Sequence, residues 1–250
     1  MRIIARLDIK NKNLIKGINL EGLKIVGEPN KFAIEYYENG IDELIFMDSV
    51  ASLYGRNNLY DIINEASNNI FIPLTVGGGI RNIDDALKAF NSGADKITVN
   101  TAAVEDNNLI NNLSKKFGSQ SLVLSIEAKK IDKNKWEVFT NNGRQETGLN
   151  VIDWCKNAED RGIGEILLTS VDMEGTKRGF DFELLNEVSA NVKVPIIASG
   201  GFGKPEHMIK AFKDCSVDAV AIADAFHYKR YLVQDLKKIA KNENLKVRSL

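Results

Sequence analysis

Residues 71–81 read FIPLTVGGGIR, and the segment IDDALKAF follows from Ile83. The apolar run is rich in β-formers and too short for a helix, which predicts a strand. The glycines leave backbone N–H groups free to approach an anion, and Asn82 or Asp84 can cap the amphipathic helix that follows. By itself the pattern fits a tight strand-to-helix turn as well as a phosphate-binding loop.

The second half of the chain repeats this arrangement. Residues 194–203 read VPIIASGGFG, where a proline again starts an apolar run that ends in glycines. Pro73 and Pro195 lie 122 residues apart. Two further pairs of segments keep nearly the same offset, namely those that begin at Asp42 and Gly164 and those that begin at Ala94 and Val217.

Length and composition agree with one domain. A chain of 250 residues with 44% hydrophobic content has the usual size of an eight-unit α/β barrel. We therefore predict a single TIM (β/α)8 barrel built from two tandem half-barrel repeats, approximately residues 1–121 and 122–250.

Charge and the rarer residue types argue against several classes of protein. The formal net charge of −1 provides no basic field for a nucleic-acid partner. Two histidines, with Cys155 and Cys215 outside any CxxC spacing, argue against a metal site, and no cofactor is expected. Charges interrupt the apolar run at the N-terminus, and no run approaches membrane-spanning length, so a cytoplasmic protein without a membrane partner is expected.

Polar side chains are expected at the mouth of the barrel. Alternation along residues 2–9 separates a polar set, which includes Arg6 and Asp8, from an apolar set that must meet the helices. Asp8 then lies at the C-terminal mouth, where barrel active sites form. A lone carboxylate is more simply a loop cap, but Glu127 ends strand five in the same way, which favours an opposed pair. The long connection after strand one carries Lys16 and is a candidate lid.

Two further segments belong to the same end of the barrel. Asn100 and Thr101 follow the fourth strand, where they either complete an anion site or cap the next helix. Asp224 holds in the second half the position that Thr101 holds in the first. After strand five, the run WEVFT and a turn at Asn142 predict a small hairpin over the mouth.

Several motifs resemble one family: LDIKN with IKG, TVGGGI, NTAAV, FGSQ, EILLTSVDMEGT, IASGG and FHY. In content and order they resemble the cyclase subunit of imidazole glycerol phosphate synthase. The resemblance implies a half-barrel-repeat TIM barrel that works beside a glutaminase subunit and receives ammonia through its interior. At the mouth, an aminoimidazole carboxamide ribonucleotide with a phosphoribulosyl-formimino arm would be cyclised and cleaved to imidazole glycerol phosphate. The substrate implied by the resemblance is a phosphorylated small molecule with a phosphate at each end.

The resemblance also implies roles for individual residues. The catalytic positions are Asp8, Glu127 and the lid lysine Lys16. Two phosphate sites are implied, one by Gly79, Asn100 and Thr101 and the other by Gly175, Gly200 and Gly201. A charged ring that gates ammonia at the barrel floor is implied at Arg2, Glu43, Lys96 and Glu165, with Asp95 on the side that faces the glutaminase.

Four residues depart from the family pattern. Glu127 is one methylene longer than the usual aspartate, and Arg6 replaces a small residue beneath Asp8. Glu174 replaces an aspartate in the sixth loop, and Asp224 replaces a small serine-like residue at the second phosphate site. Because an unpaired guanidinium inside a barrel is costly, we predict an Arg6–Glu127 ion pair that holds Glu127 ionised.

Three functions remain open at this point. The first is an ammonia-dependent cyclase and lyase of histidine biosynthesis that acts with a glutaminase. The second is an ammonia-channelling subunit of a sugar amidation system with altered or weak chemistry, which fits a changed mouth above an intact floor ring. The third, the sister isomerase of the same pathway, shares the repeat and the phosphate loops, but FGSQ and the complete floor set favour the cyclase.

Overall fold

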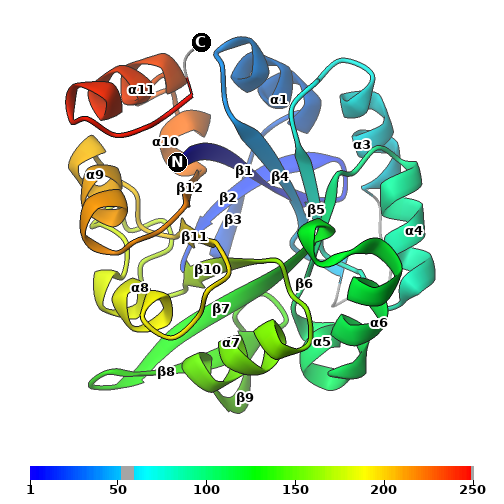
Figure 1. The fold of residues 1–250 in the computed structure, drawn as a ribbon. Coiled ribbons are helices and arrows are strands. Elements are labelled where there is room, and N and C mark those ends of the chain that lie inside the picture. The colour runs from blue at the N-terminus through cyan, green and yellow to red at the C-terminus, as the bar shows by residue number, and fades with distance from the viewer. Residues whose placement is uncertain (52–58, 249–250) are drawn as a thin grey trace.

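Eight parallel strands close into a ring in the computed structural model, which describes residues 1–51 and 59–248 (Figure 1). Each of these strands pairs in parallel with two neighbours, including β1 with β12 and β7 with β10. The predicted TIM barrel is therefore confirmed. Around the ring the strands are β1 (Arg2–Lys10), β4 (Glu43–Asp48), β5 (Leu74–Gly77), β6 (Lys96–Val99), β7 (Leu122–Asp132), β10 (Glu165–Ser170), β11 (Ile196–Ser199) and β12 (Ala219–Ile222).

Helices cover the outside of the ring (Figure 1). No helix within the described ranges is long and apolar enough to span a membrane. The helices are α1 (Pro29–Glu38), α3 (Tyr60–Ser67), α4 (Ile83–Asn91), α5 (Thr101–Glu105), α6 (Asn108–Phe117), α7 (Val151–Asp160), α8 (Phe182–Ser189), α9 (Pro205–Asp214), α10 (Asp224–His227) and α11 (Val233–Asn242), with the 3-10 turn η1 (Ser119–Ser121).

Several helices begin at capping signals that are readable in the sequence. The side chain of Asn82 accepts a hydrogen bond from the backbone N–H of Asp85 at 2.9 Å, so Asn82 rather than Asp84 caps α4. Asn150 accepts from the N–H of Ile152 at 2.8 Å and caps α7 in the same way. These caps fix where each strand-to-helix loop ends.

Alternation along β1 separates the two cores of the barrel. Ile3, Ala5 and Leu7 belong to the large core between the strands and the helices. Ile4 points the other way, into a small apolar cluster that fills the barrel interior. That interior cluster consists of Ile4, Ile45, Val123, Leu167, Ile197, Ala219 and Ala221.

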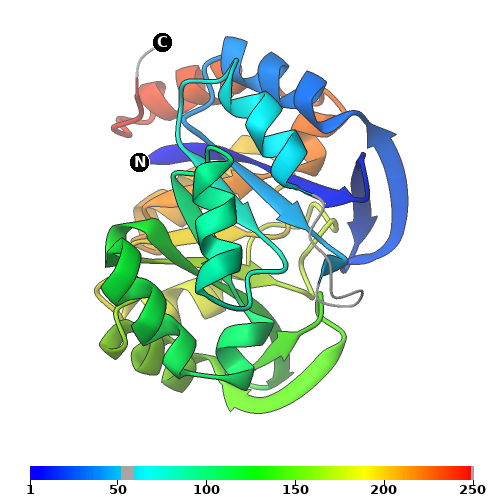
Figure 2. The ribbon, with the colours of Figure 1, turned by 90° about the vertical axis from the view of Figure 1, so that its right-hand side faces the viewer.

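Two β-hairpins extend from the C-terminal end of the barrel. The long connection predicted as a loop is a hairpin of β2 (Asn13–Ile18) and β3 (Glu21–Gly27), and β2 pairs antiparallel with β1. The predicted hairpin after strand five is confirmed, since β7 continues past the ring and pairs with β8 (Lys135–Thr140), which pairs with β9 (Gln145–Asn150). Figure 2 shows both hairpins on the side toward which the barrel strands point.

Carboxylates join neighbouring strands at the opposite end, the floor. Asp42 accepts a hydrogen bond from the N–H of Ile3 at 2.8 Å, and Asp95 accepts from Leu74 N–H at 2.8 Å. Asp218 accepts from the N–H of Ile196 at 3.0 Å. Each of these three carboxylates therefore satisfies a strand-start donor that the ladder leaves unpaired.

One of these carboxylates is also part of a buried ion pair. The ammonium group of Lys237 on α11 contacts Asp42, and the two side chains are only 3% and 4% exposed. Ile3 N–H and Lys237 together satisfy both oxygens of Asp42. Removal of one partner would leave a charge buried without compensation.

We expect Lys237→Met to lower the free energy of unfolding by about 3 kcal/mol, because the Asp42 carboxylate stays buried with a single backbone donor. Urea unfolding followed by circular dichroism measures the change. The matched control is Lys238→Met, since Lys238 is exposed on the same helix. Equal stabilities of the two variants would contradict a structural role for the pair.

Candidate active site

Asp8 and Glu127 lie on opposite sides of the barrel mouth. Three strands separate β1 from β7 in either direction around the ring, so the two strands face each other. Asp8 is 6% exposed and Glu127 is 9% exposed. Both side chains point into the interior rather than toward the helices, and the charge of Asp8 adds a small contribution that raises the pKa of Glu127.

Arg6 pairs with Asp8 and not with Glu127, so the predicted Arg6–Glu127 ion pair is wrong. The Nε of Arg6 donates to Asp8 Oδ1 at 2.9 Å. One terminal nitrogen donates to Thr169 Oγ1 at 2.9 Å and to Ser199 Oγ at 3.2 Å. The guanidinium therefore reaches from β1 toward β10 and β11, away from β7.

Glu127 is held by two other donors. Its Oε2 accepts from the backbone N–H of Gly143 at 2.7 Å and from Asn100 Nδ2 at 3.2 Å. Gly143 belongs to the turn between β8 and β9, so the extra methylene of Glu127 lets the carboxylate reach this turn. Asn100, implied as a phosphate ligand, also donates to the carbonyl oxygen of Phe139 at 3.1 Å, so its amide N–H groups are engaged within the protein.

The two carboxylates have opposite pKa shifts. Burial would raise the pKa of Asp8, but attraction to Arg6 and to Lys16 outweighs burial, and the pKa lies below its ordinary value. Burial raises the pKa of Glu127 to about 7, against the lowering effect of the Gly143 hydrogen bond. Glu127 is therefore not held ionised as predicted: near neutral pH a large fraction is protonated while Asp8 is charged.

Lys16 lies on β2 and forms a buried ion pair with Glu174, which belongs to the loop after β10. The lid hairpin is tied to the same loop, since Asn19 N–H donates to the Glu174 carbonyl oxygen at 2.9 Å. Gly175 has φ of +72°, and a Cβ atom there would come within 2.6 Å of the Gly17 carbonyl oxygen. The lid therefore packs closely on the second half of the mouth.

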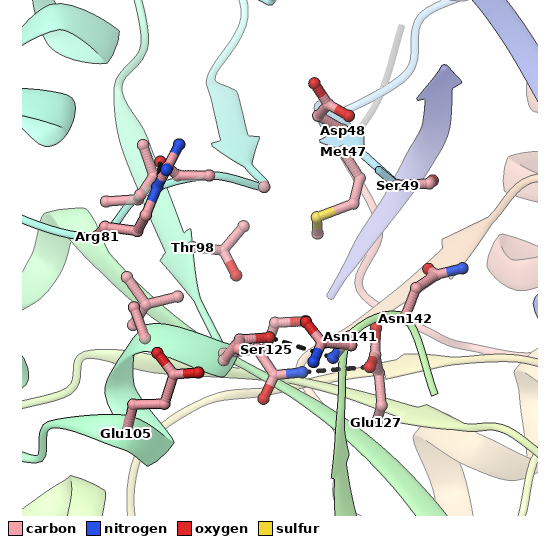
Figure 3. A pocket seen from close by; sticks show the side chains of 17 residues that line it. Met47, Asp48, Ser49, Arg81, Thr98, Glu105, Ser125, Glu127, Asn141 and Asn142 are labelled. Atoms are coloured by element: carbon pink, nitrogen blue, oxygen red, sulfur yellow. Dashed lines mark hydrogen bonds between the residues drawn. The ribbon is translucent and has the colours of Figure 1, made fainter. Parts of the chain in front are cut away.

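The first half of the mouth contains an open cavity of about 220 Å³. The glycine loop contributes Gly78 and Gly79, which have φ of +89° and +78°. Thr101 borders the cavity and accepts a hydrogen bond from Asn141 N–H at 3.2 Å. Figure 3 shows Glu127 beside Asn142, with Arg81 on the other side of the cavity. The corresponding cavity in the second half, lined by Gly175, Gly200 and Gly201, has only about 20 Å³.

The implied floor ring assembles as four charges of alternating sign. Arg2 contacts Glu43 at 2.7 Å and also Glu165. Lys96 Nζ lies 3.1 Å from Glu43 and 2.9 Å from Glu165. Thr75 adds a hydrogen bond of 2.7 Å to Glu43. The ring closes the interior below the apolar cluster around Ile4.

Sequence reasoning missed Gly143, Thr169 and Ser199 as contacts of the mouth residues. Alternation along EILLTS and IASGG would have placed Thr169 and Ser199 inside the barrel. Gly143 carried no comparable signal, because its contact depends on how the hairpin folds back. In the described ranges, no group of three or more His, Cys, Asp or Glu side chains is placed to hold a metal ion.

His227 in the FHY motif is also buried near the mouth. Its Nδ1 lies 2.7 Å from the hydroxyl oxygen of Tyr36. Burial, together with the nearby charge of Lys16, lowers the pKa of His227 to about 4. The imidazole is therefore neutral at physiological pH and contributes no charge to the mouth.

Comparison with known proteins was made on the whole chain. The family described as "Histidine biosynthesis protein" matches residues 2–231. The imidazole glycerol phosphate synthase subunit HisF of Legionella pneumophila is 58% identical over 206 residues, which cover 82% of this chain and 97% of that protein. The subunit of the same name from Bacillus cereus (strain ATCC 10987 / NRS 248) is 43% identical over 247 residues, covering 99% and 98%.

We expect Arg6→Met to raise the pKa of Asp8, because burial is then opposed by Lys16 without the help of the guanidinium. Carboxyl ¹³C chemical shifts recorded across a pH titration measure this pKa. Arg178→Met is the control, since Arg178 is exposed on the loop after β10. An unchanged Asp8 pKa in Arg6→Met would show that another group holds the carboxylate ionised.

Proposed function

The chain belongs to the family of histidine biosynthesis proteins, as a cyclase subunit of the imidazole glycerol phosphate synthase type, and from this premise we propose how its mouth carries out the reaction. Asp8 acts as the general base and Glu127 as the general acid in ammonia-dependent ring closure and cleavage. The products are imidazole glycerol phosphate and an aminoimidazole carboxamide ribonucleotide. Lys16 on the lid hairpin covers the bound substrate.

One observation carries this proposal: two opposed, buried carboxylates whose pKa values are shifted apart. Ring closure needs one group that takes a proton from the attacking nitrogen and another that gives a proton to the departing oxygen. A pair of acids in different protonation states at the same pH supplies both groups. Arg6 maintains the difference, because it stabilises the charge of Asp8 and leaves Glu127 without an ion pair.

Ammonia is proposed to reach the mouth through the barrel. The ring of Arg2, Glu43, Lys96 and Glu165 lies at the floor, and the Ile4 cluster lies above it. An apolar layer admits neutral NH3 far more readily than NH4⁺, because a charge is costly to desolvate. Lys96 is the proposed moving part, since its side chain is 19% exposed and a lysine stem has four carbons with rotatable bonds.

The glutaminase subunit is proposed to dock at the floor near Asp95. Asp95 borders a shallow depression there, together with Phe71, whose side chain is 76% exposed. An exposed aromatic residue beside a charge is a common feature of protein interfaces. The gate above this surface would receive ammonia directly from the partner.

A second function is favoured by the changed second half of the mouth. Asp224 and Glu174 place carboxylates beside Gly200 and Gly201, where the family resemblance implies a phosphate. This supports the alternative of an ammonia-channelling subunit for sugar amidation with weak chemistry of its own. Complementation of a histidine auxotroph separates the two functions, because only the cyclase restores growth.

We expect Asp8→Asn and Glu127→Gln each to lower kcat by about 10²- to 10⁴-fold with ammonia as nitrogen source. Wild-type kcat should fall as pH rises through about 7, because Glu127 must be protonated to act as the acid. The assay is run at a fixed concentration of NH3, so that titration of ammonium does not distort the profile. A profile that is flat from pH 6 to pH 8, or full activity of Glu127→Gln, would contradict the acid role.

We expect Asp95→Asn to weaken binding of the glutaminase subunit by about tenfold or more while ammonia-driven turnover is retained. The matched control is Asp218→Asn, because Asp218 makes the same hydrogen bond to a strand start in the other half. Titration calorimetry with the glutaminase measures the affinity. Equal losses in both variants would point to a structural effect instead of docking.

A further inference from the structure

The two halves of the mouth differ at one pair of equivalent positions. Residues 94–102 and 217–225 correspond in the internal repeat, which aligns Thr101 with Asp224. The backbone agrees with this alignment: Asn100 has φ −138° and ψ −89°, and Ala223 has φ −120° and ψ −76°. The same unusual turn therefore presents a hydroxyl group in one half and a carboxylate in the other.

Cations from two different segments lie beside Asp224. Arg230, just after α10, forms an ion pair with its carboxylate. Lys177, in the loop after β10, places its ammonium group 3.9 Å from Asp224 Oδ1. The Asp224 side chain is 14% exposed, so this cation-lined position is already filled by an anion of the protein itself.

Glu174 adds a second carboxylate on the same side. Its Oε2 lies 3.4 Å from the position that a Cβ atom of Gly200 would take, so the carboxylate sits directly over the glycine turn. Its other oxygen, Oε1, is paired with Lys16. The cavity that remains is about 20 Å³, much smaller than the cavity of about 220 Å³ in the first half of the mouth.

We propose that Asp224 acts as a built-in anion that neutralises the second half of the mouth, so that the chain binds one phosphate monoester strongly, in the first half beside Thr101. A second phosphate enters only by displacing Asp224 from Arg230, and repulsion between the two anions opposes this step. The far end of the ligand meets Asp224 and Glu174, which accept hydrogen bonds from hydroxyl or amino groups. The inference rests on the proposed function, because it concerns the substrate of that site.

Calorimetric titration of the full chain with inorganic phosphate tests the inference. We expect one site per chain in the wild type, weakened about tenfold or more by Thr101→Val. Asp224→Thr, which copies the first half, should add a second site, and Asp224→Thr with Arg230→Met should lose it again. Asp214→Thr is the control, since it removes the same charge at the exposed end of α9.

Two sites of equal affinity in the wild type would overturn the inference, and so would a single site in a folded Asp224→Thr variant. If Asp224→Thr fails to fold, Asp224→Asn removes the charge with little change of shape. Turnover provides a separate readout: Asp224→Thr should lower KM for the substrate with two phosphates. Absence of turnover in every variant would refute the proposed function and leave the phosphate stoichiometry as a valid test of the inference.

Discussion

Closure of the strands into a ring forces every second side chain of each strand into a narrow interior, and the rest of the molecule depends on this constraint. Along β1, the inward positions are Arg2, Ile4, Arg6 and Asp8, which gives an ionic floor, an apolar layer, a buried guanidinium and a carboxylate at the mouth. Because each layer is completed by other strands, the chemistry of the mouth and of the floor is set by the register of those strands.

Much of the fold was predictable because sequence signals agreed with each other. The repeat segments that begin at Asp42 and Gly164 contain the ring strands β4 and β10, and each strand is an apolar run with a charge at its start and turn residues after it. The lid hairpin was missed because Gly17 and Gly22 suggested a loop, and its strands are defined by long-range pairing, of β2 with β1 and of β3 with β2. The partner of Arg6 was predicted wrongly because alternation gives the side of a strand but not the direction in which a long side chain reaches.

The proposed roles of Glu127 as acid and Asp8 as base rest on contacts that no single motif encodes. A longer side chain at position 127 was expected to form an ion pair, yet it reaches the hairpin turn at Gly143, where a backbone N–H donates to it. Attraction to Arg6 lowers the pKa of Glu127 by less than burial raises it. Arg6 donates hydrogen bonds to Asp8, Thr169 and Ser199. Two departures that suggested weakened chemistry therefore combine into a pair of carboxyl groups with different proton affinities.

The Lys237–Asp42 ion pair belongs to the seam where the last strand meets the first, and this seam has no covalent continuity. The counterpart of this seam in the repeat lacks the pair, because Gly164 takes the place of Asp42. A Cβ atom at Gly164 would come within 2.0 Å of the Ser119 carbonyl oxygen, so no side chain fits there. The seam between β6 and β7 is instead joined by the chain itself. In a circular permutant that begins at residue 122, the chain would be continuous between β12 and β1, where the Lys237–Asp42 ion pair lies. The open seam would then lie between β6 and β7, which has no such ion pair. The two half-barrels are therefore not interchangeable as starting points for the chain.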